Sequence, residues 1–139
     1  RLNKPAGLGA VTRSFLSEAL AKSGDHEQPT SIAKITDGTS KTLLLGEKRM
    51  NLQRMGQMQP NDNEGYTTAW NHDTVRYVGL PPLPDFYHPS EFRDSFGSSH
   101  TGGFNACFAD SSVRFLQYDI KHDVFKAMGV RMDGQVIPE

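Results

Sequence analysis

Apolar and polar positions alternate most regularly between residues 104 and 115. Phe104, Ala106 and Phe108 are separated by single residues, which is the period of two that is typical of a β-strand. The polar residues 110–112 interrupt this alternation, and an apolar-polar-apolar sequence then resumes it. The pattern predicts a β-hairpin with a tight polar turn. We expect its large apolar side chains to join the main core: Phe104, Phe108, Val113 and Phe115.

Two other segments have the helical period. In residues 12–22 the apolar positions share one face with Val11 and the polar positions take the other, and Gly24 is placed to end the helix. Residues 119–129 show the same pattern, with Asp119 as the expected N-cap and Gly129 as the expected end. The stripe of residues 12–22 is expected to face the core rather than a membrane or a partner. The apolar positions of the two stripes are Val11, Phe15, Leu16, Ala19 and Leu20, then Ile120, Val124, Phe125 and Met128.

The segment between residues 31 and 48 combines a short helical turn with a strand. Ser31 is an expected N-cap, and Asp37 with Gly38 is an expected stop. The apolar run within residues 42–48 then predicts a buried strand.

Residues 51–93 are the least regular part of the chain. β-Favouring residues within 66–78 predict one or two strands, whereas the prolines of 80–85 predict an extended, irregular segment. Asn61–Gly65 resembles a calcium loop, but its spacing does not match that of an EF-hand, which favours a solvated turn. A last strand is expected within residues 133–137.

These elements predict an α+β fold with an antiparallel sheet and short helices. The length of 139 residues suits one domain, with residues 1–30 forming an N-terminal loop and short helix, and residues 31–139 forming the main body. The formal net charge is -1, and the 15 basic and 16 acidic residues are well mixed. Such a balance does not indicate a nucleic-acid partner or an anionic membrane surface.

The single cysteine, Cys107, excludes an internal disulfide and is expected to be a small packed side chain. No apolar run approaches the ~20 residues that a membrane span requires. The chain also begins with Arg1 rather than Met. We therefore expect it to be a mature or truncated part of a longer protein.

The entry to the predicted hairpin carries the candidate chemistry. Gly102 and Gly103 follow His100 and indicate a backbone with positive φ or a close approach to another group. Asp110 can accept a hydrogen bond from the backbone two residues further on. His100 and Asp110 are therefore expected to fix the loop and the turn, and a ligand or metal contact is the alternative. Glu47, at the end of an apolar strand, either emerges into solvent or is paired in a polar cluster. We expect a structural partner, either in the Gly-rich loop before Phe104 or in the Asp37 turn.

No enzyme is expected from the motifs. His100 with Asp110, or His72 with Asp73, would be half of a hydrolase site, but the sequence has no Gly-x-Ser-x-Gly elbow, no His-Glu-x-x-His and no Cys/His cluster.

Two motifs carry a family resemblance. His100, nine residues, and then Asp110-Ser-Ser-Val-Arg114-Phe is similar to the C-terminal signature of a bacterial family of prepilin-like proteins, which are related to type II secretion pseudopilins. The sequence departs from it at Ser111, where that family usually has Gly. Ile35-Thr-Asp37-Gly38-Thr-Ser-Lys41-Thr, followed by three apolar residues and Gly46-Glu47, resembles the family's second signature, with Lys41 in place of Asn. The structural motif residues are thus Asp37, Gly38, Glu47, His100, Gly102, Gly103, Asp110 and Arg114.

The resemblance implies a pilin- or pseudopilin-like globular head without enzymatic activity. Its partners would be other pilin-like subunits, joined through an N-terminal prepilin helix that would also be its contact with the membrane and that is absent from this sequence. The head would lie in the cell envelope, on the periplasmic or extracellular side. The alternative is an extracytoplasmic binding module that recognises a polysaccharide or peptide through residues 66–90.

The resemblance also bears on metal binding, because some major pseudopilins hold calcium in the C-terminal part of the head. Calcium takes six to eight oxygen ligands. The candidate donors are Asp37, Glu47, Asp94 and Asp110. Asp37 and Asp110 each also have a turn-forming role that needs no metal. We therefore expect no cofactor, with a calcium site as the alternative.

Overall fold

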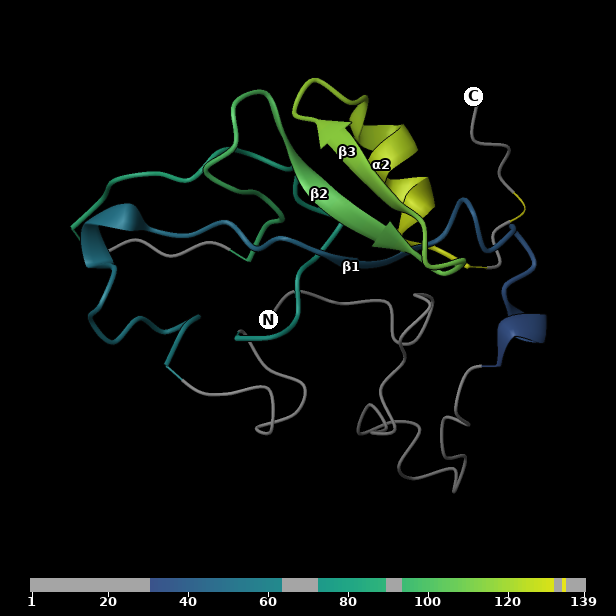
Figure 1. Ribbon diagram of the computed structural model, residues 1–139, viewed down its shortest axis with the longest axis horizontal. Coiled ribbons are helices and arrows are strands. Elements are labelled where there is room, and N and C mark those ends of the chain that lie inside the picture. Colours follow the sequence, from purple (N-terminus) through teal and green to yellow (C-terminus); the bar gives the residue numbers. More distant parts are fainter. Residues whose placement is uncertain (1–30, 64–72, 90–93, 132–133, 135–139) are drawn as a thin grey trace.

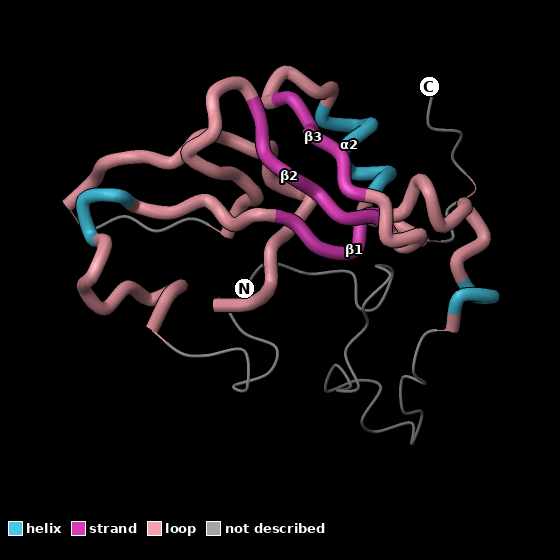
Figure 2. The backbone as a smooth tube through the Cα atoms, viewed as in Figure 1, coloured by secondary structure: helices cyan, strands magenta, loops and turns pink. Residues whose placement is uncertain are grey.

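The computed structural model describes residues 31–63, 73–89, 94–131 and 134 of the chain. Loops and turns make up most of this part (Figure 2). The regular elements follow one another as η1 (Ile32–Lys34), β1 (Leu43–Gly46), η2 (Leu52–Arg54), β2 (Gly103–Phe108), β3 (Val113–Gln117) and α2 (His122–Met128). The predicted helix at residues 12–22, the tail strand at 133–137 and the expected strand region 66–72 lie wholly or largely outside the described residues.

The three strands form one antiparallel sheet in the order β1-β2-β3, with β2 in the middle (Figure 1). β2 and β3 pair without interruption from Gly103 opposite Gln117 to Cys107 opposite Val113. β1 pairs with β2 through a bulge between Leu43 and Leu45. The sheet and the short helices confirm the α+β class, and the two long strands confirm the predicted hairpin.

The core lies on one face of the sheet and consists mainly of aromatic rings. Phe104 and Phe108 of β2 and Phe125 of α2 are fully buried. The Phe125 ring stands edge-on to that of Phe104 at 6.1 Å and to that of Phe96 at 5.7 Å. Because α2 supplies Phe125 to this cluster, α2 covers the core face of the sheet. Leu116 of β3 completes the strand contribution to the core.

The predicted burial of Val113 and Phe115 is wrong. Val113 is 68% exposed and Phe115 is 49% exposed. Residues paired directly across two strands point to the same face, and these two are paired with Cys107 and Asn105 of β2. They therefore lie on the face opposite to Phe104 and Phe108. The alternate residues of β3, Arg114 and Leu116, take the core side instead.

Arg114, the polar residue of the apolar-polar-apolar sequence, lies on the core side rather than pointing outward. Its guanidinium carbon lies 4.3 Å from the centroid of the Phe108 ring, so the side chain covers the end of the core while its charged head remains partly exposed. The apolar pattern of β3 taken alone predicts the wrong core residues, because the length of the turn determines which face of the sheet each residue of β3 takes.

The hairpin turn forms in the predicted place. The Asp110 carboxylate accepts hydrogen bonds from Ser112 N at 2.9 Å and Ser112 Oγ at 2.6 Å, which confirms the expected bond to the backbone two residues on. These bonds lower the pKa of Asp110 because they stabilise its charged form. Ser111 has φ +68°, so a serine occupies the left-handed conformation that favours glycine.

Helix α2 begins later than predicted. Lys121 occupies the N-cap position and makes no side-chain cap bond, so Asp119 is not the cap. Gly129 ends the helix as predicted, with its N–H bonded to the carbonyls of Lys126 and Ala127. Its φ of -83° is ordinary, so the glycine serves a different need: a Cβ at this position would lie 2.3 Å from Val78 Cγ2. Gly129 permits a close approach rather than a left-handed turn.

Three further expectations need correction in the first half of the chain. The helical turn after Ser31 is the 3-10 helix η1, and the Ser31 side chain makes no cap bond. The strand predicted within residues 42–48 is the shorter β1, and it is not buried throughout, because Leu45 is 61% exposed. Residues 73–78 contain no strand, so the strand prediction for 66–78 is wrong in its described part.

Two other parts of the irregular region are informative. Of the described part of the Asn61–Gly65 turn, Asp62 and Asn63 are exposed as the prediction of a solvated turn requires, whereas Asn61 is only 2% exposed. The proline-rich segment is extended as predicted, and it runs beside another extended segment: Leu83 N donates to Phe96 O, and Asp85 N donates to Ser98 O.

Candidate functional site

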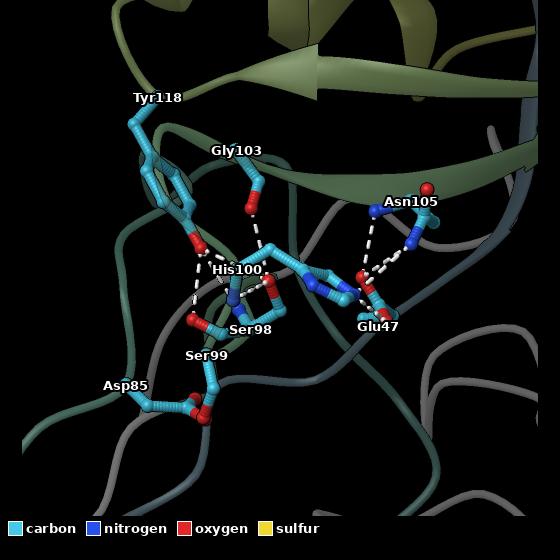
Figure 3. Close-up of polar contacts among 8 residues, drawn as sticks. All are labelled: Glu47, Asp85, Ser98, Ser99, His100, Gly103, Asn105 and Tyr118. Carbon is cyan, nitrogen blue, oxygen red and sulfur yellow. Dashed lines mark hydrogen bonds and ion pairs between the residues drawn. The ribbon is translucent and has the colours of Figure 1, made fainter.

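Glu47 joins the two sequence motifs at one place. One carboxylate oxygen, Oε2, accepts hydrogen bonds from Asn105 N at 2.7 Å and Asn105 Nδ2 at 3.3 Å. The other, Oε1, lies 3.2 Å from His100 Nε2 (Figure 3). Glu47 therefore has a structural partner, as predicted. The partners are His100 and Asn105 of β2, and not the Asp37 turn. We call Glu47, His100 and Asn105 the Glu-His-Asn cluster.

The backbone explains why Glu47 reaches this position. Directly after β1 the chain continues beside β2, because Glu47 N donates to Asn105 O at 3.2 Å. The carbonyl of Glu47 accepts from Gly97 N at 3.0 Å, so the same residue pairs with the extended segment that precedes His100. From this position the Glu47 side chain bonds both β2 and the loop that carries His100.

The contacts of the His100 ring indicate one tautomer. Nε2 lies 3.2 Å from Glu47 Oε1 and 3.2 Å from Asn105 Nδ2. A carboxylate oxygen can only accept, so the contact between Nε2 and Oε1 is a hydrogen bond when Nε2 carries the proton and donates it. In neutral His100 this leaves the Nδ1 lone pair away from Glu47. The imidazole side chain is 54% exposed, so the cluster lies at the surface.

A second network fixes the loop before β2. Ser98 Oγ donates to Gly103 O at 2.9 Å and accepts from His100 N at 3.0 Å. The Tyr118 hydroxyl donates to Ser98 O at 2.9 Å and accepts from Ser98 N at 3.0 Å (Figure 3). Ser98 is thus held by both ends of the hairpin, and it holds the backbone of His100 in turn.

The predicted glycine requirement is confirmed at both positions. Gly102 has φ +85°. A Cβ on Gly103 would lie 2.2 Å from Leu116 O and 2.7 Å from a carbon of the Phe115 ring, so no larger residue fits there without moving β3. The ring of Phe115 also lies edge-on to that of His100, with 6.4 Å between centroids. The glycines therefore bring the loop against β3 and set where the imidazole stands.

Asp85 ties the proline-rich segment to this loop. One of its oxygens accepts from Met50 N at 2.6 Å, and the other accepts from Ser99 Oγ at 2.6 Å. Figure 3 shows this pair apart from the Glu-His-Asn cluster, on the other side of the His100 loop. Asp85 has a positioning role, since its two bonds join three separate segments.

A group of opposite charges lies in the irregular region. Lys48 Nζ pairs with the Asp62 carboxylate and donates to Asn61 O at 3.1 Å. Asp73 is buried and accepts from Asn63 N at 2.7 Å. Burial lowers the pKa of Arg76, and the nearby carboxylate of Asp94 acts in the opposite direction. These contacts connect loop residues to one another. The group contains both acidic and basic side chains.

The four candidate calcium ligands have different surroundings. Asp37 accepts from Gly134 N at 2.9 Å, and Asp110 binds Ser112 in the hairpin turn. Asp94 stands beside Arg76, whereas Glu47 belongs to the Glu-His-Asn cluster. Within the described residues, no group of three or more His, Cys, Asp or Glu side chains lies close enough to hold a metal ion.

Sequence reasoning found Glu47, His100 and the two glycines but missed their partners. Asn105, Ser98 and Tyr118 are not exceptional in sequence. One signal was present for Asn105: it is a polar residue in the strand, five residues after His100, and its side chain must leave the core face. Nothing in the sequence indicated that Tyr118 would bond to a serine 20 positions earlier.

No helix in the described ranges combines the length and the apolar character that crossing a membrane requires. No curated protein and no solved structure matches the chain significantly. A family model does match, over residues 10–123 of the 139. This span includes both sequence motifs and the whole Glu-His-Asn cluster. The chain therefore belongs to the family SBP_bac_10, described as "Protein of unknown function (DUF1559)".

Proposed function

We propose that this chain is the globular head of a prepilin- or pseudopilin-like structural subunit, exposed outside the inner membrane of a bacterium and assembled with other pilin-like subunits through an N-terminal helix beyond this sequence. The observation that carries the proposal is the meeting of the two signature motifs: Glu47 of the first motif bonds His100 of the second and the strand that follows it. The signature residues thus build the head itself.

The chemistry of the cluster supports a structural role. Glu47 has hydrogen-bond partners on both oxygens, and those partners belong to the same chain. Ser98 accepts from the backbone of His100 and donates to a carbonyl, so it is not poised as a nucleophile activated by the imidazole. A non-enzymatic subunit agrees with this arrangement, in which each side chain serves to fix a loop to the sheet.

The decisive experiment uses the complete protein in the bacterium that produces it. Surface material is sheared off, labelled with antibodies against residues 31–139 and viewed by electron microscopy. Labelled filaments, or a labelled short pseudopilus after overproduction, are expected. A strain in which the prepilin peptidase is inactive is the control and should yield no labelled assembly. Labelled protein that is exported but never assembled would contradict the proposal.

One observation favours a second candidate, an extracytoplasmic binding module. Tyr87 lies just after the proline-rich segment 80–85, within residues 66–90, and is 74% exposed, as expected of an aromatic platform for a sugar ring or a peptide. Retention of the soluble chain on immobilised polysaccharide, lost in Tyr87→Ala but not in Tyr77→Ala, would support this alternative. Retention of neither variant nor wild type would leave the structural role as the better account.

A further inference from the structure

Strand β3 is one of the two outer strands of the sheet (Figure 1). Hydrogen bonds at both ends of its pairing with β2 show which of its main-chain groups point inward. Phe108 N donates to Ser112 O at 2.9 Å, and Tyr118 N donates to Gly102 O at 2.9 Å. In an antiparallel pair the direction of these groups alternates along the strand. The even-numbered residues of β3 therefore bond to β2, and the odd-numbered residues point their N–H and C=O groups away from β2.

The outward-pointing groups belong to Val113, Phe115 and Gln117. The Gln117 carbonyl accepts from Ile120 N at 3.2 Å. In the described part of the chain, no hydrogen bond joins the N–H or C=O groups of Val113 and Phe115 to a partner. Their side chains are exposed as well, Val113 to 68% and Phe115 to 49%. This edge of β3 therefore presents unpaired donors and acceptors to which a further strand can bond.

The edge of β3 has few of the features that prevent strand pairing. Edge strands are commonly protected by a bulge, a proline, a short length or a charge. The β2–β3 pairing has no bulge, and β3 contains no proline. The one charged residue of β3, Arg114, already has partners in its own chain, the Phe108 ring and the Asp110 carboxylate. The other outer strand, β1, has only four residues and a bulge against β2, so β3 is the better edge for pairing.

We propose that β3 pairs with β3 of a second copy of this chain, in antiparallel orientation and with the two-fold axis at Phe115. In this register the N–H of each Phe115 donates to the carbonyl of the other. Val113 lies opposite Gln117 of the second copy, so Gln117 N can donate to the Val113 carbonyl. A two-fold interface requires a surface that is complementary to itself. A strand whose central residue points both its donor and its acceptor outward meets this requirement, and the two sheets become one.

The side chains fit this register. Phe115 meets Phe115 of the second copy, and aromatic pairs directly across two strands are stabilising. The Phe115 ring already lies close to Gly103 and edge-on to His100, so little side-chain freedom is lost on pairing. Arg114 lies opposite Leu116 of the second copy, so no two like charges meet. Because the paired segment is short, the interface belongs to the small, weakly associating class.

The full 139-residue chain is suitable for the test. Sedimentation equilibrium between about 10 µM and about 1 mM should show a monomer at the lower end and a dimer at the upper end. Amide hydrogen exchange followed by NMR should show that protection of the Phe115 amide rises about ten-fold over the same range. Leu116 is an internal control, because its amide faces β2 and its protection should not change with concentration.

Four variants test the register. Phe115→Lys places like charges directly opposite each other at the two-fold axis and should weaken dimerisation by about ten-fold or more. Val113→Lys adds the same charge to the same edge but faces Gln117, so it should retain most of the affinity. Phe115→Pro removes the outward N–H without removing a bond to β2 and should abolish the dimer. Phe115→Thr keeps that N–H and should still dimerise. Circular dichroism shows that each variant is folded.

The outcomes distinguish a second copy from other occupants of the edge. A dimer that is lost in Phe115→Lys but kept in Val113→Lys supports the proposal, even if Phe115→Pro does not fold. A chain that stays monomeric at about 1 mM would overturn it. A dimer that both lysine substitutions affect equally would overturn it too, because the axis would then not lie at Phe115.

Protection of the Phe115 amide that persists on dilution would show that a segment of the same chain covers the edge, and this result would also overturn the proposal. None of these measurements depends on filament assembly. The pairing of β3 and the proposed function can therefore fail separately.

Discussion

Glu47 and Asn105 bond to each other through both main chain and side chain. Glu47 N donates to Asn105 O at 3.2 Å, and Asn105 N donates in return to the Glu47 carboxylate at 2.7 Å. The bond from Glu47 N continues the β1–β2 pairing by one residue. The bond from Asn105 N goes to the Glu47 side chain instead of to a main-chain carbonyl. The strand pairing can therefore end here, and the loop carrying His100 can approach without leaving an unpaired amide on Asn105.

Glu47→Ala should lower the free energy of unfolding by about 1–3 kcal/mol, because the N–H of Asn105 loses a charged acceptor in a partly buried position. Glu47→Gln should lose less, since one amide oxygen can still accept from Asn105 N. Urea unfolding followed by tryptophan fluorescence measures both. If the two variants were as stable as wild type, the cluster would be incidental to the fold.

The two faces of the hairpin predict opposite results for two phenylalanines. Phe108 is fully buried, and Phe108→Ala should lower the free energy of unfolding by about 3–5 kcal/mol. Phe115 is 49% exposed, and Phe115→Ala should lose only about 1 kcal/mol. The comparison of the two urea midpoints is its own control, because both changes remove the same atoms. Similar losses at both positions would contradict the observed register.

Ser111→Gly should stabilise the protein by about 0.5–1 kcal/mol. Ser111 has φ +68°, and a residue with a Cβ is strained in this conformation whereas glycine is not. The gain is reduced by the greater freedom of glycine in the unfolded chain. Ser112→Gly is the matched control and should destabilise, because the Ser112 hydroxyl donates to Asp110. A destabilised Ser111→Gly would mean that the turn does not hold this φ in solution.

The sequence predicted the hairpin and helix α2 but not which residues of the hairpin face the core, and it wrongly predicted a strand in residues 73–78. The period of two found β2, because Phe104, Ala106 and Phe108 are all on the core side. It failed on β3, where the turn decides which residues share a face with β2, and a shift of one residue exchanges Phe115 for Leu116. The amphipathic pattern found α2 but placed its cap two residues early, at Asp119 rather than Lys121.

The candidate site shows the same limit. Its glycines, its histidine and its glutamate are visible in sequence because their types are unusual for their positions. The bond between Glu47 and His100 spans 53 positions, and no local pattern fixes such a distance. Ser98 and Tyr118 were missed because hydroxyl side chains are common in loops and at strand ends. Their role follows only from the hydrogen bonds that the fold allows between them.

The stability of the hairpin turn should depend on pH through Asp110. Hydrogen bonds from Ser112 lower the pKa of Asp110 in the folded protein, and Arg114 acts in the same direction. A lowered carboxyl pKa contributes stability that is fully present above the unfolded pKa of about 3.9 and is lost as the pH falls through the lower, folded value. Asp110→Asn keeps an oxygen for Ser112 N but cannot titrate.

The stability difference between wild type and Asp110→Asn should therefore be constant from pH 7 to about pH 5 and should shrink below about pH 4. Urea midpoints across this range measure it, and an NMR titration of the Asp110 carboxyl gives its pKa directly. Asp123→Asn is a suitable control, because Asp123 also bonds a nearby backbone N–H but lies outside the hairpin. A difference that instead grew as the pH fell would mean that the turn prefers the protonated carboxyl, which would contradict a turn held by Ser112 donating to a charged Asp110.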